Sequence, residues 1–320
     1  MIFPGIPAVG PSGAGEKPME TSPATRTVTM ELSCDKSVGA ESTASVSVPE
    51  GLKVGKTVVL HIDRSKPVEA AKQAELPKVK QLAYWGSSEK IPKGQPKVTE
   101  PGSAAQDAVK VSGEVLEALS VVPKVPSGSF AYWPDVNSEP LVSDITAPGT
   151  YALSTNYCGK TWITLGNEQE FLAPIELVNL PESFDFEKPI KIEWKPVPEA
   201  LGYVVNAYGG NEKESIAWTC GSTSNPPMNI DYWAVSKKDV QQFIEKGILL
   251  PPTATTCTIP AGVFKGAKTA VLTMTALGAD RIQDKDEIQT QVVVRSTTSV
   301  PLFTKPYSQP EVPAAEGNAQ

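Results

Sequence analysis

Four cysteines and a single histidine carry the most reactive side chains of this 320-residue chain. Cys34, Cys158, Cys220 and Cys257 lie far apart, without the close CxxC spacing typical of zinc or redox sites. This spacing favours disulfides or buried thiols. Four cysteines allow three pairings, and connectivity does not follow from sequence. The pairing that keeps each bond within one of the domains predicted below joins Cys34 to Cys158 and Cys220 to Cys257, and it would imply an oxidising compartment.

His61 is the only imidazole, so any histidine-dependent catalytic triad would have to be built on it. It lies in the alternating segment 58–63, where it is expected on the outward side of a strand. No GxSxG, Walker A or HExxH motif occurs in the chain. We therefore interpret His61 as an ordinary strand residue and predict a non-enzymatic protein with no catalytic residues, metal site or cofactor. A pair of catalytic carboxylates is the enzymatic alternative, although no motif points to one.

An acidic cluster near the C-terminus could supply carboxylate oxygens to calcium. It contains Asp280, Asp284, Asp286 and Glu287, but it lacks the loop spacing and the glycine of an EF-hand. A solvated turn between the last two strands is the preferred interpretation.

Aromatic residues next to turn-forming neighbours could expose rings that stack on sugars or anchor a protein partner. The candidates are Trp85, Trp133, Tyr232 and Trp233. The competing interpretation is core packing. We prefer core packing for three other aromatics at predicted strand positions, Trp194, Tyr203 and Trp218, because large rings dominate the interiors of sandwiches.

The composition limits which folds and which kinds of partner are expected. The 30 prolines argue against a mostly helical fold, because proline lacks the backbone donor that a helix interior needs. A net charge of −7 with scattered lysines does not suit nucleic-acid binding. No apolar run reaches about 18 residues, so no membrane-spanning helix is expected. Residues 1–15 also lack the basic and apolar regions of an intact secretory signal.

The distribution of strand patterns predicts an all-β fold of two sandwich-like domains between proline-rich tails. Residues 1–24 are rich in proline and glycine and are predicted to form an arm. Segment 25–33 follows, with Val28, Met30 and Leu32 on one face, as in a half-buried strand. The predicted units are the arm 1–24, a first β domain 25–178, a second sandwich 179–300 and a tail 301–320.

The expected elements are short strands, with one helix inserted into the second domain. Ser236 could cap the start of this helix and Gly247 its end. Beyond segment 25–33, the predicted strands are 55–63, 149–155, 160–165 and 171–178 in the first domain, and 188–194, 201–208, 215–219, 256–259, 268–276 and 288–296 in the second.

The string IEWKPVPEALGY at 192–203 resembles the B-to-C strand signature of fibronectin type III-like domains, in which an inward tryptophan and a tyrosine flank a proline turn. Together with YWG at 84–86, GQP at 94–96, YWP at 132–134 and the stretch 249–260, it makes the chain similar to an uncharacterised family of exported bacterial proteins. The resemblance implies export and a fibronectin type III-like second domain. The family has no assigned activity to transfer.

These observations lead to two expectations of function. The first is an exported structural or interaction protein of the cell surface, extracellular space or periplasm, a self-assembling subunit whose terminal arms dock on copies of itself. Strand addition at a sheet edge would be the mechanism, with 28–32 as the candidate element. The alternative is glycan binding through the loop aromatics.

Overall fold

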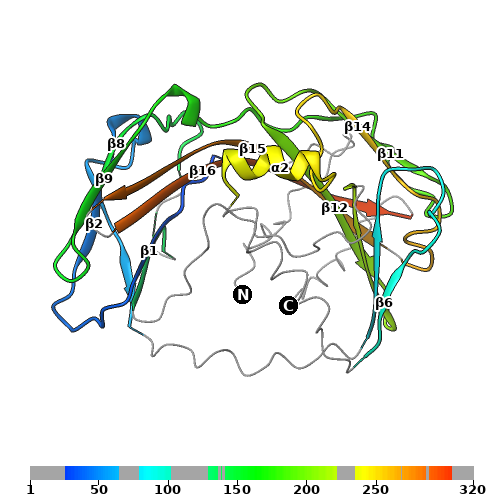
Figure 1. Cartoon of the computed structure of the whole chain (residues 1–320), viewed down its shortest axis with the longest axis horizontal. Helices are drawn as coiled ribbons and strands as arrows, with labels where there is room; N and C mark the ends of the chain where they lie inside the picture. Colours follow the sequence, from blue (N-terminus) through cyan, green and yellow to red (C-terminus); the bar gives the residue numbers. More distant parts are fainter. Residues whose placement is uncertain are drawn as a thin grey trace, which may run out of the picture.

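Strands dominate the described part of the protein, where they form four sheets in two lobes. The computed structural model describes residues 26–64, 79–101, 129–135, 138, 141–221, 235–267, 269–285 and 288–304. Within these ranges there is one α-helix, which confirms the prediction of an all-β, sandwich-like fold with a single helix. The predicted arm 1–24 and the part of the predicted tail beyond 304 lie outside the described residues. Figure 1 shows the two lobes joined by strands β15 and β16.

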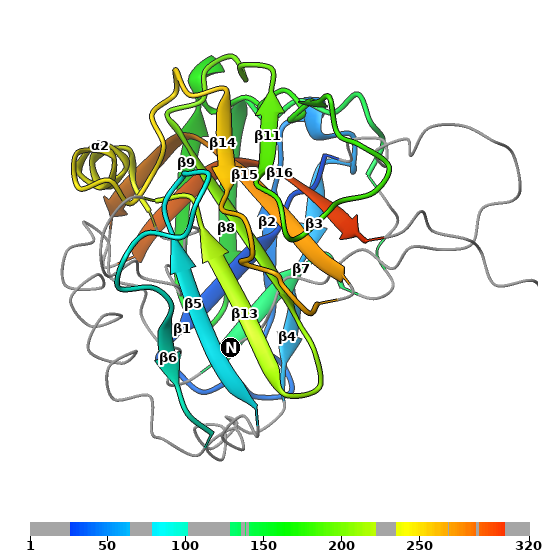
Figure 2. The same cartoon turned by 90° about the vertical axis from the view of Figure 1, so that its right-hand side faces the viewer.

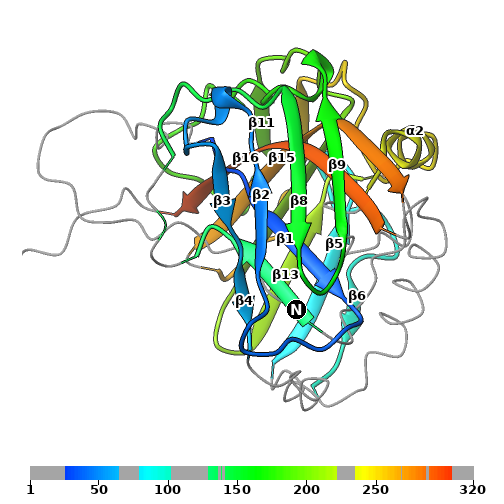
Figure 3. The same ribbon diagram turned by 90° about the vertical axis from the view of Figure 1, so that its left-hand side faces the viewer.

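The first sandwich is built from a three-stranded and a four-stranded antiparallel sheet. The strand orders are β1-β7-β4 and β3-β2-β8-β9, the latter seen in Figure 3. Both sheets contribute to one apolar core, which includes Leu32, Val46, Ile62, Ala131 and Trp133. The strands are β1 (Met30–Cys34), β2 (Ala44–Ser47), β3 (Thr57–Val59), β4 (His61–Asp63), β7 (Ser129–Trp133), β8 (Gly149–Thr155) and β9 (Lys160–Leu165), with 3-10 turns η1 (Glu50–Leu52) and η2 (Asn167–Gln169).

Alternation of side chains explains most of these strands, and β8 and β9 occur where the pattern predicts them. In β9, Ile163 and Leu165 are buried whereas Trp162 is exposed. The predicted strand 55–63, however, is two strands in different sheets. The chain changes layer at Leu60, whose N–H donates to the Ala44 carbonyl at 2.9 Å. The alternation of apolar and polar residues is therefore continuous even where the chain passes from one sheet to the other.

The second sandwich combines a six-stranded and a three-stranded sheet. The orders are β16-β15-β12-β13-β5-β6, seen in Figure 2, and β10-β11-β14. Its core contains the predicted trio Ile192, Trp194 and Tyr203, each at most 3% exposed. The strands are β5 (Lys80–Trp85), β6 (Lys97–Thr99), β10 (Leu177–Val178), β11 (Ile190–Trp194), β12 (Gly202–Gly210), β13 (Glu214–Thr219), β14 (Thr256–Ile259), β15 (Thr269–Lys285) and β16 (Ile288–Phe303).

The second sandwich also takes strands from the sequence range expected for the first. β5 pairs in parallel with β13, and Leu82 and Tyr84 enter the second core. β10 likewise pairs with β11, and it is all that forms of the predicted strand 171–178. The first sandwich therefore does not occupy 25–178 without interruption. Local alternation reports which face of a strand is buried, but it carries no information about the strand's neighbour.

The predicted helix forms as α2 (Lys237–Glu245) and covers part of the six-stranded sheet. Ser236 accepts from the Asp239 N–H, and the Asp239 side chain accepts from the Ser236 N–H in return. Val240 and Phe243 pack with Val204 of β12 on the outer face of the sheet. The start of β12 is consequently buried on both faces.

The last two strands run well beyond their predicted lengths and connect the lobes. The β15–β16 ladder continues past an irregularity between Leu277 and Asp280. Beyond it, the Gln283 side chain donates to the Trp162 carbonyl of β9, and Gln169 of η2 donates to the Asp280 carbonyl at 3.4 Å. The extension could not be predicted from the sequence after Leu277. That part of the hairpin does not cover an apolar core, so its residues are mostly polar and lack an alternating apolar pattern.

A buried hydrogen bond in the second sandwich gives a direct test of its packing. The Val197 N–H donates to the Tyr203 hydroxyl at 2.9 Å, and Tyr203 is 0% exposed. Tyr203→Phe leaves this N–H without its acceptor, so we expect a loss of about 1–3 kcal/mol in unfolding free energy, measured by guanidinium denaturation. The matched control is Tyr208→Phe, at a ring that is 44% exposed. Equal denaturation midpoints for both variants would contradict this packing.

Candidate functional site

His61 contacts a tyrosine and an aspartate at the surface of the first sandwich. Its ring centroid lies 5.2 Å from that of Tyr132, and Nδ1 is 4.0 Å from Asp135 Oδ2. The imidazole side chain is 52% exposed. This is the outward strand position that the alternation predicts, and a polar contact this long and this exposed contributes little to stability.

The acidic cluster is not a single turn, which corrects the sequence-based interpretation. Asp280 and Asp284 lie within β15, whereas Asp286 and Glu287 fall outside the described residues. The Asp280 carboxylate accepts from the Lys237 N–H at 2.9 Å and so stabilises the first turn of α2. Within the described part of the chain, no group of three or more His, Cys, Asp or Glu side chains is arranged to hold a metal ion.

The candidate aromatics have different environments. Trp133 is 9% exposed and belongs to the first core, so it does not serve as a surface anchor. It lies opposite Met30 of β1, where both side chains face the interior. Trp85 is half-buried at the end of β5, with its backbone N–H bonded to the Gln95 side chain at 2.9 Å. Tyr232 and Trp233 lie outside the described residues.

The N-terminal strand is half-buried, as its alternation predicts, and the candidate interaction residues Val28, Met30 and Leu32 lie on its inward face. Leu32 is buried, and Val28 and Met30 pack against the first core. The position of the strand is nevertheless notable, because β1 is an edge strand of its sheet. What β1 presents outward is backbone, together with the exposed side chains Glu31 and Ser33.

Two exposed apolar features were missed at the level of sequence. Trp162 of β9 is 49% exposed, and the Lys285 ammonium lies over its ring. On the open part of the six-stranded sheet, Tyr208 and Val271 are cross-strand partners, and Pro301 lies opposite Val271. An apolar residue on the otherwise polar side of an alternating strand is the signal that could have indicated these positions.

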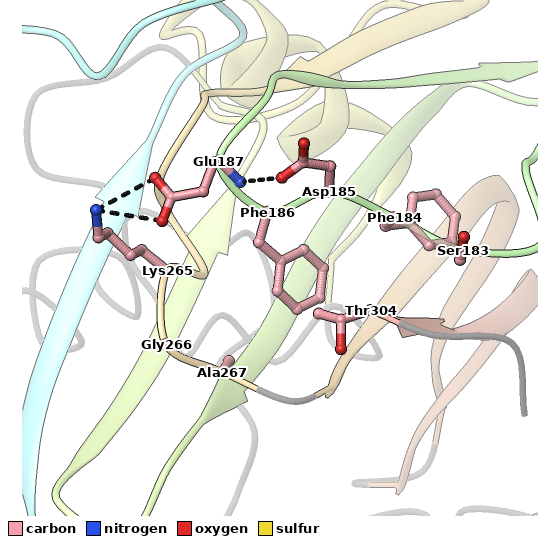
Figure 4. A pocket seen from close by; sticks show the side chains of 9 residues that line it. All are labelled: Ser183, Phe184, Asp185, Phe186, Glu187, Lys265, Gly266, Ala267 and Thr304. Atoms are coloured by element: carbon pink, nitrogen blue, oxygen red, sulfur yellow. Dashed lines mark hydrogen bonds and ion pairs between the residues drawn. The ribbon is translucent and has the colours of Figure 1, made fainter.

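The pocket shown in Figure 4 is an open hollow of about 430 Å³ at one end of the second sandwich. Lys265 pairs with Glu187 at 3.2 Å, and Asp185 accepts from the Glu187 N–H at 3.0 Å. That N–H and then Lys188 hold the pKa of Asp185 below its usual range. Glu187 is thus paired with Lys265 across the hollow, whereas the partner of Asp185, Lys188, is not among the lining residues. The lining residues are Ser183, Phe184, Asp185, Phe186, Glu187, Lys265, Gly266, Ala267 and Thr304.

The four cysteines fall into two pairs of neighbouring side chains. Cys34 is beside Cys158, and Cys220 is beside Cys257. All four are free thiols in this structure. The fold thus brings each pair of cysteines together from distant parts of the chain, as it does Met30 and Trp133.

Comparisons with family models, with curated proteins and with solved structures find no match for this chain. The resemblance to an exported bacterial family therefore stays a prediction. Among the described residues, the single helix is too short to traverse a bilayer.

The two tryptophan environments predict losses of stability of different size when the side chains are truncated. Trp133→Ala opens a cavity in the first core, so we expect a loss of about 3–5 kcal/mol in unfolding free energy. Trp162→Ala removes an exposed ring and its cation–π contact, so we expect a loss of about 1 kcal/mol or less. Guanidinium denaturation of both variants measures the difference. A stable Trp133→Ala protein would show that this ring is not part of the core.

Proposed function

We propose that this protein is an exported, non-enzymatic structural or interaction protein that associates with copies of itself. The N-terminal arm of one copy would dock on the first sandwich of the next. The observation that carries the proposal is the position of β1 (Met30–Cys34), which follows the arm directly and lies at the edge of the sheet β1-β7-β4.

An edge strand suits this role because half of its backbone donors and acceptors point away from its sheet partner. An added strand binds these groups through main-chain hydrogen bonds and needs no preformed pocket. Glu31 and Ser33 are exposed along β1, while Leu32 turns into the core. The proposed docking surface is therefore the outer backbone of β1, with the 24-residue arm of a neighbouring copy as its occupant.

The point at which the arm leaves the sandwich is held by two contacts. The Arg26 guanidinium donates to the Ile145 carbonyl and also lies 5.4 Å from the centroid of the Phe171 ring. These contacts hold Arg26, four residues before β1, against the first sandwich. Such an anchor supports transfer of the arm to a neighbour, because the segment after it remains tied to its own core.

Export is supported by the cysteine positions and by the resemblance described above. Secreted sandwich domains commonly join their cysteines in disulfides, whereas cytosolic thiols stay reduced. Two pairs of adjacent cysteines, one in each sandwich, are consistent with a protein made for an oxidising compartment. The glycan-binding alternative has less support, because Trp133 is buried in the core.

Removal of the arm tests the proposed assembly. We expect the full chain to form oligomers in light scattering and the variant lacking residues 1–24 to show the mass of one 34.1 kDa chain less the arm. A matched control lacks residues 305–320 and should keep the oligomeric mass. A synthetic peptide of residues 1–24, added in excess to the full chain, should dissociate the oligomer without any mutation.

Two outcomes would contradict this function. If the full chain stays monomeric at every concentration, the protein does not associate with copies of itself. An oligomer whose mass per chain is unchanged by both the deletion and the peptide shows that the arm is not the contact.

A further inference from the structure

Each sandwich contains one cysteine pair whose members come from its two different sheets. Cys34 ends β1 of the three-stranded sheet, and Cys158 lies in the turn between β8 and β9 of the four-stranded sheet. Cys220 directly follows β13 of the six-stranded sheet, and Cys257 lies in β14 of the three-stranded sheet opposite it. Both pairs thus occupy the space between layers, where a covalent bond would join the two sheets.

The backbone around each pair is held in place. Cys158 sits in a tight turn, where its N–H donates to Thr155 Oγ1 at 2.8 Å and Gly159 follows with a φ of +98°. The Cys220 N–H donates to the Val205 carbonyl at 2.9 Å, and Cys257 pairs with Ile192 in the β11–β14 ladder. The proximity of the thiols therefore follows from the strand framework and does not depend on a loose loop.

We propose that Cys34 with Cys158, and Cys220 with Cys257, are the sites of two intramolecular disulfides, each of which staples the two sheets of one sandwich. This does not rest on the arm-mediated assembly, since the bonds lie within one chain. It selects one of the three possible pairings.

A metal site is the main alternative for adjacent cysteines, and it lacks ligands here. Structural zinc takes four ligands, usually cysteine and histidine. Within the described ranges no third His, Cys, Asp or Glu side chain joins either pair. The only histidine, His61, contacts Tyr132 and Asp135 instead.

The acidity of the thiols fits structural bonds better than catalytic redox chemistry. Burial and the neighbouring Cys34 raise the pKa of Cys158 to about 12. The hydrogen bond with Cys220, followed by burial, raises the pKa of Cys257 well above its usual value. Redox-active cysteines need the opposite, a depressed pKa that maintains a thiolate at neutral pH. Once the fold is complete, Cys220 and Cys257 are buried, so their oxidation belongs to an earlier stage when they are exposed.

The oxidant is a protein disulfide of an exported oxidoreductase. A thiolate of the chain attacks this disulfide to form a mixed disulfide, and the second thiolate displaces the oxidant's sulfur. One S–S bond forms per cysteine pair, and two electrons together with the two thiol protons pass to the oxidant. The oxidant becomes a dithiol. The Cys34–Cys158 bond closes the longer loop, so it restricts the unfolded chain more than the Cys220–Cys257 bond.

Exposure predicts that the two bonds differ in their resistance to reduction. Cys158 is partly exposed, whereas Cys220 and Cys257 are each 2% exposed. A small thiol reductant should therefore open Cys34–Cys158 in the native protein first. Opening of Cys220–Cys257 should require unfolding.

Mass spectrometry of the full chain, produced with export to an oxidising compartment, tests the pairing. We expect the intact mass to fall by four hydrogen masses relative to the reduced chain, and no cysteine to be alkylated in denaturant without reductant. Proteolysis should yield two cross-linked peptides, one with Cys34 and Cys158, the other with Cys220 and Cys257. In Cys34→Ala, Cys158 alone should become alkylated, which does not require the variant to be fully stable.

The same measurements define failure. Four alkylated cysteines in the exported wild-type chain, or cross-linked peptides in either other pairing, would overturn the proposal. So would loss of the Cys220–Cys257 bond in Cys34→Ala. The mass-spectrometric result does not depend on whether the arm deletion changes the oligomeric mass. The disulfide proposal and the assembly proposal can therefore be refuted independently.

Discussion

The ladder between β15 and β16 connects the two sandwiches and limits how they are arranged. At one end, Met274 and Leu302 of this hairpin lie in the core of the second sandwich. At the other end, Gln283 and Lys285 contact Trp162 of the first. The backbone hydrogen bonds between β15 and β16 continue through both regions, so this one hairpin belongs to the second sandwich and also contacts the first. Gly278 lies at its irregularity, where an added Cβ would approach the Val294 side chain to 3.1 Å.

Both lobes depend on the same physical arrangement, in which alternate side chains are buried between two sheets. The second sandwich has the larger core, and its six-stranded sheet is covered by α2 on part of the outer face. The remaining outer face exposes Tyr208 and Val271. In each lobe the cysteine pair spans the gap between layers. Small domains of exported proteins often use such cross-links, because their limited cores provide little stability.

Several charged groups on the described surface have partners within the chain. His61 pairs with Asp135, Lys265 pairs with Glu187, and Asp280 supports the first turn of α2. The features directed outward are sheet edges, such as β1, and sheet faces. A strand edge recognises another strand through backbone groups that every residue except proline possesses in full. Its partner is therefore set by geometry and access more than by particular side chains.

The fold class, the alternating faces of most strands, a helix between Ser236 and Gly247 with its Ser236 cap, and the burial of Ile192, Trp194 and Tyr203 could all be predicted from the sequence. These properties are local, because side-chain period and capping depend on residues a few positions apart. The folded chain was needed to establish that β5 joins β13, that segment 55–63 divides between two sheets, that Trp133 is buried, and which cysteines are neighbours. Those outcomes depend on which distant strands pair, and the backbone hydrogen bonds that select a partner are nearly the same for every residue.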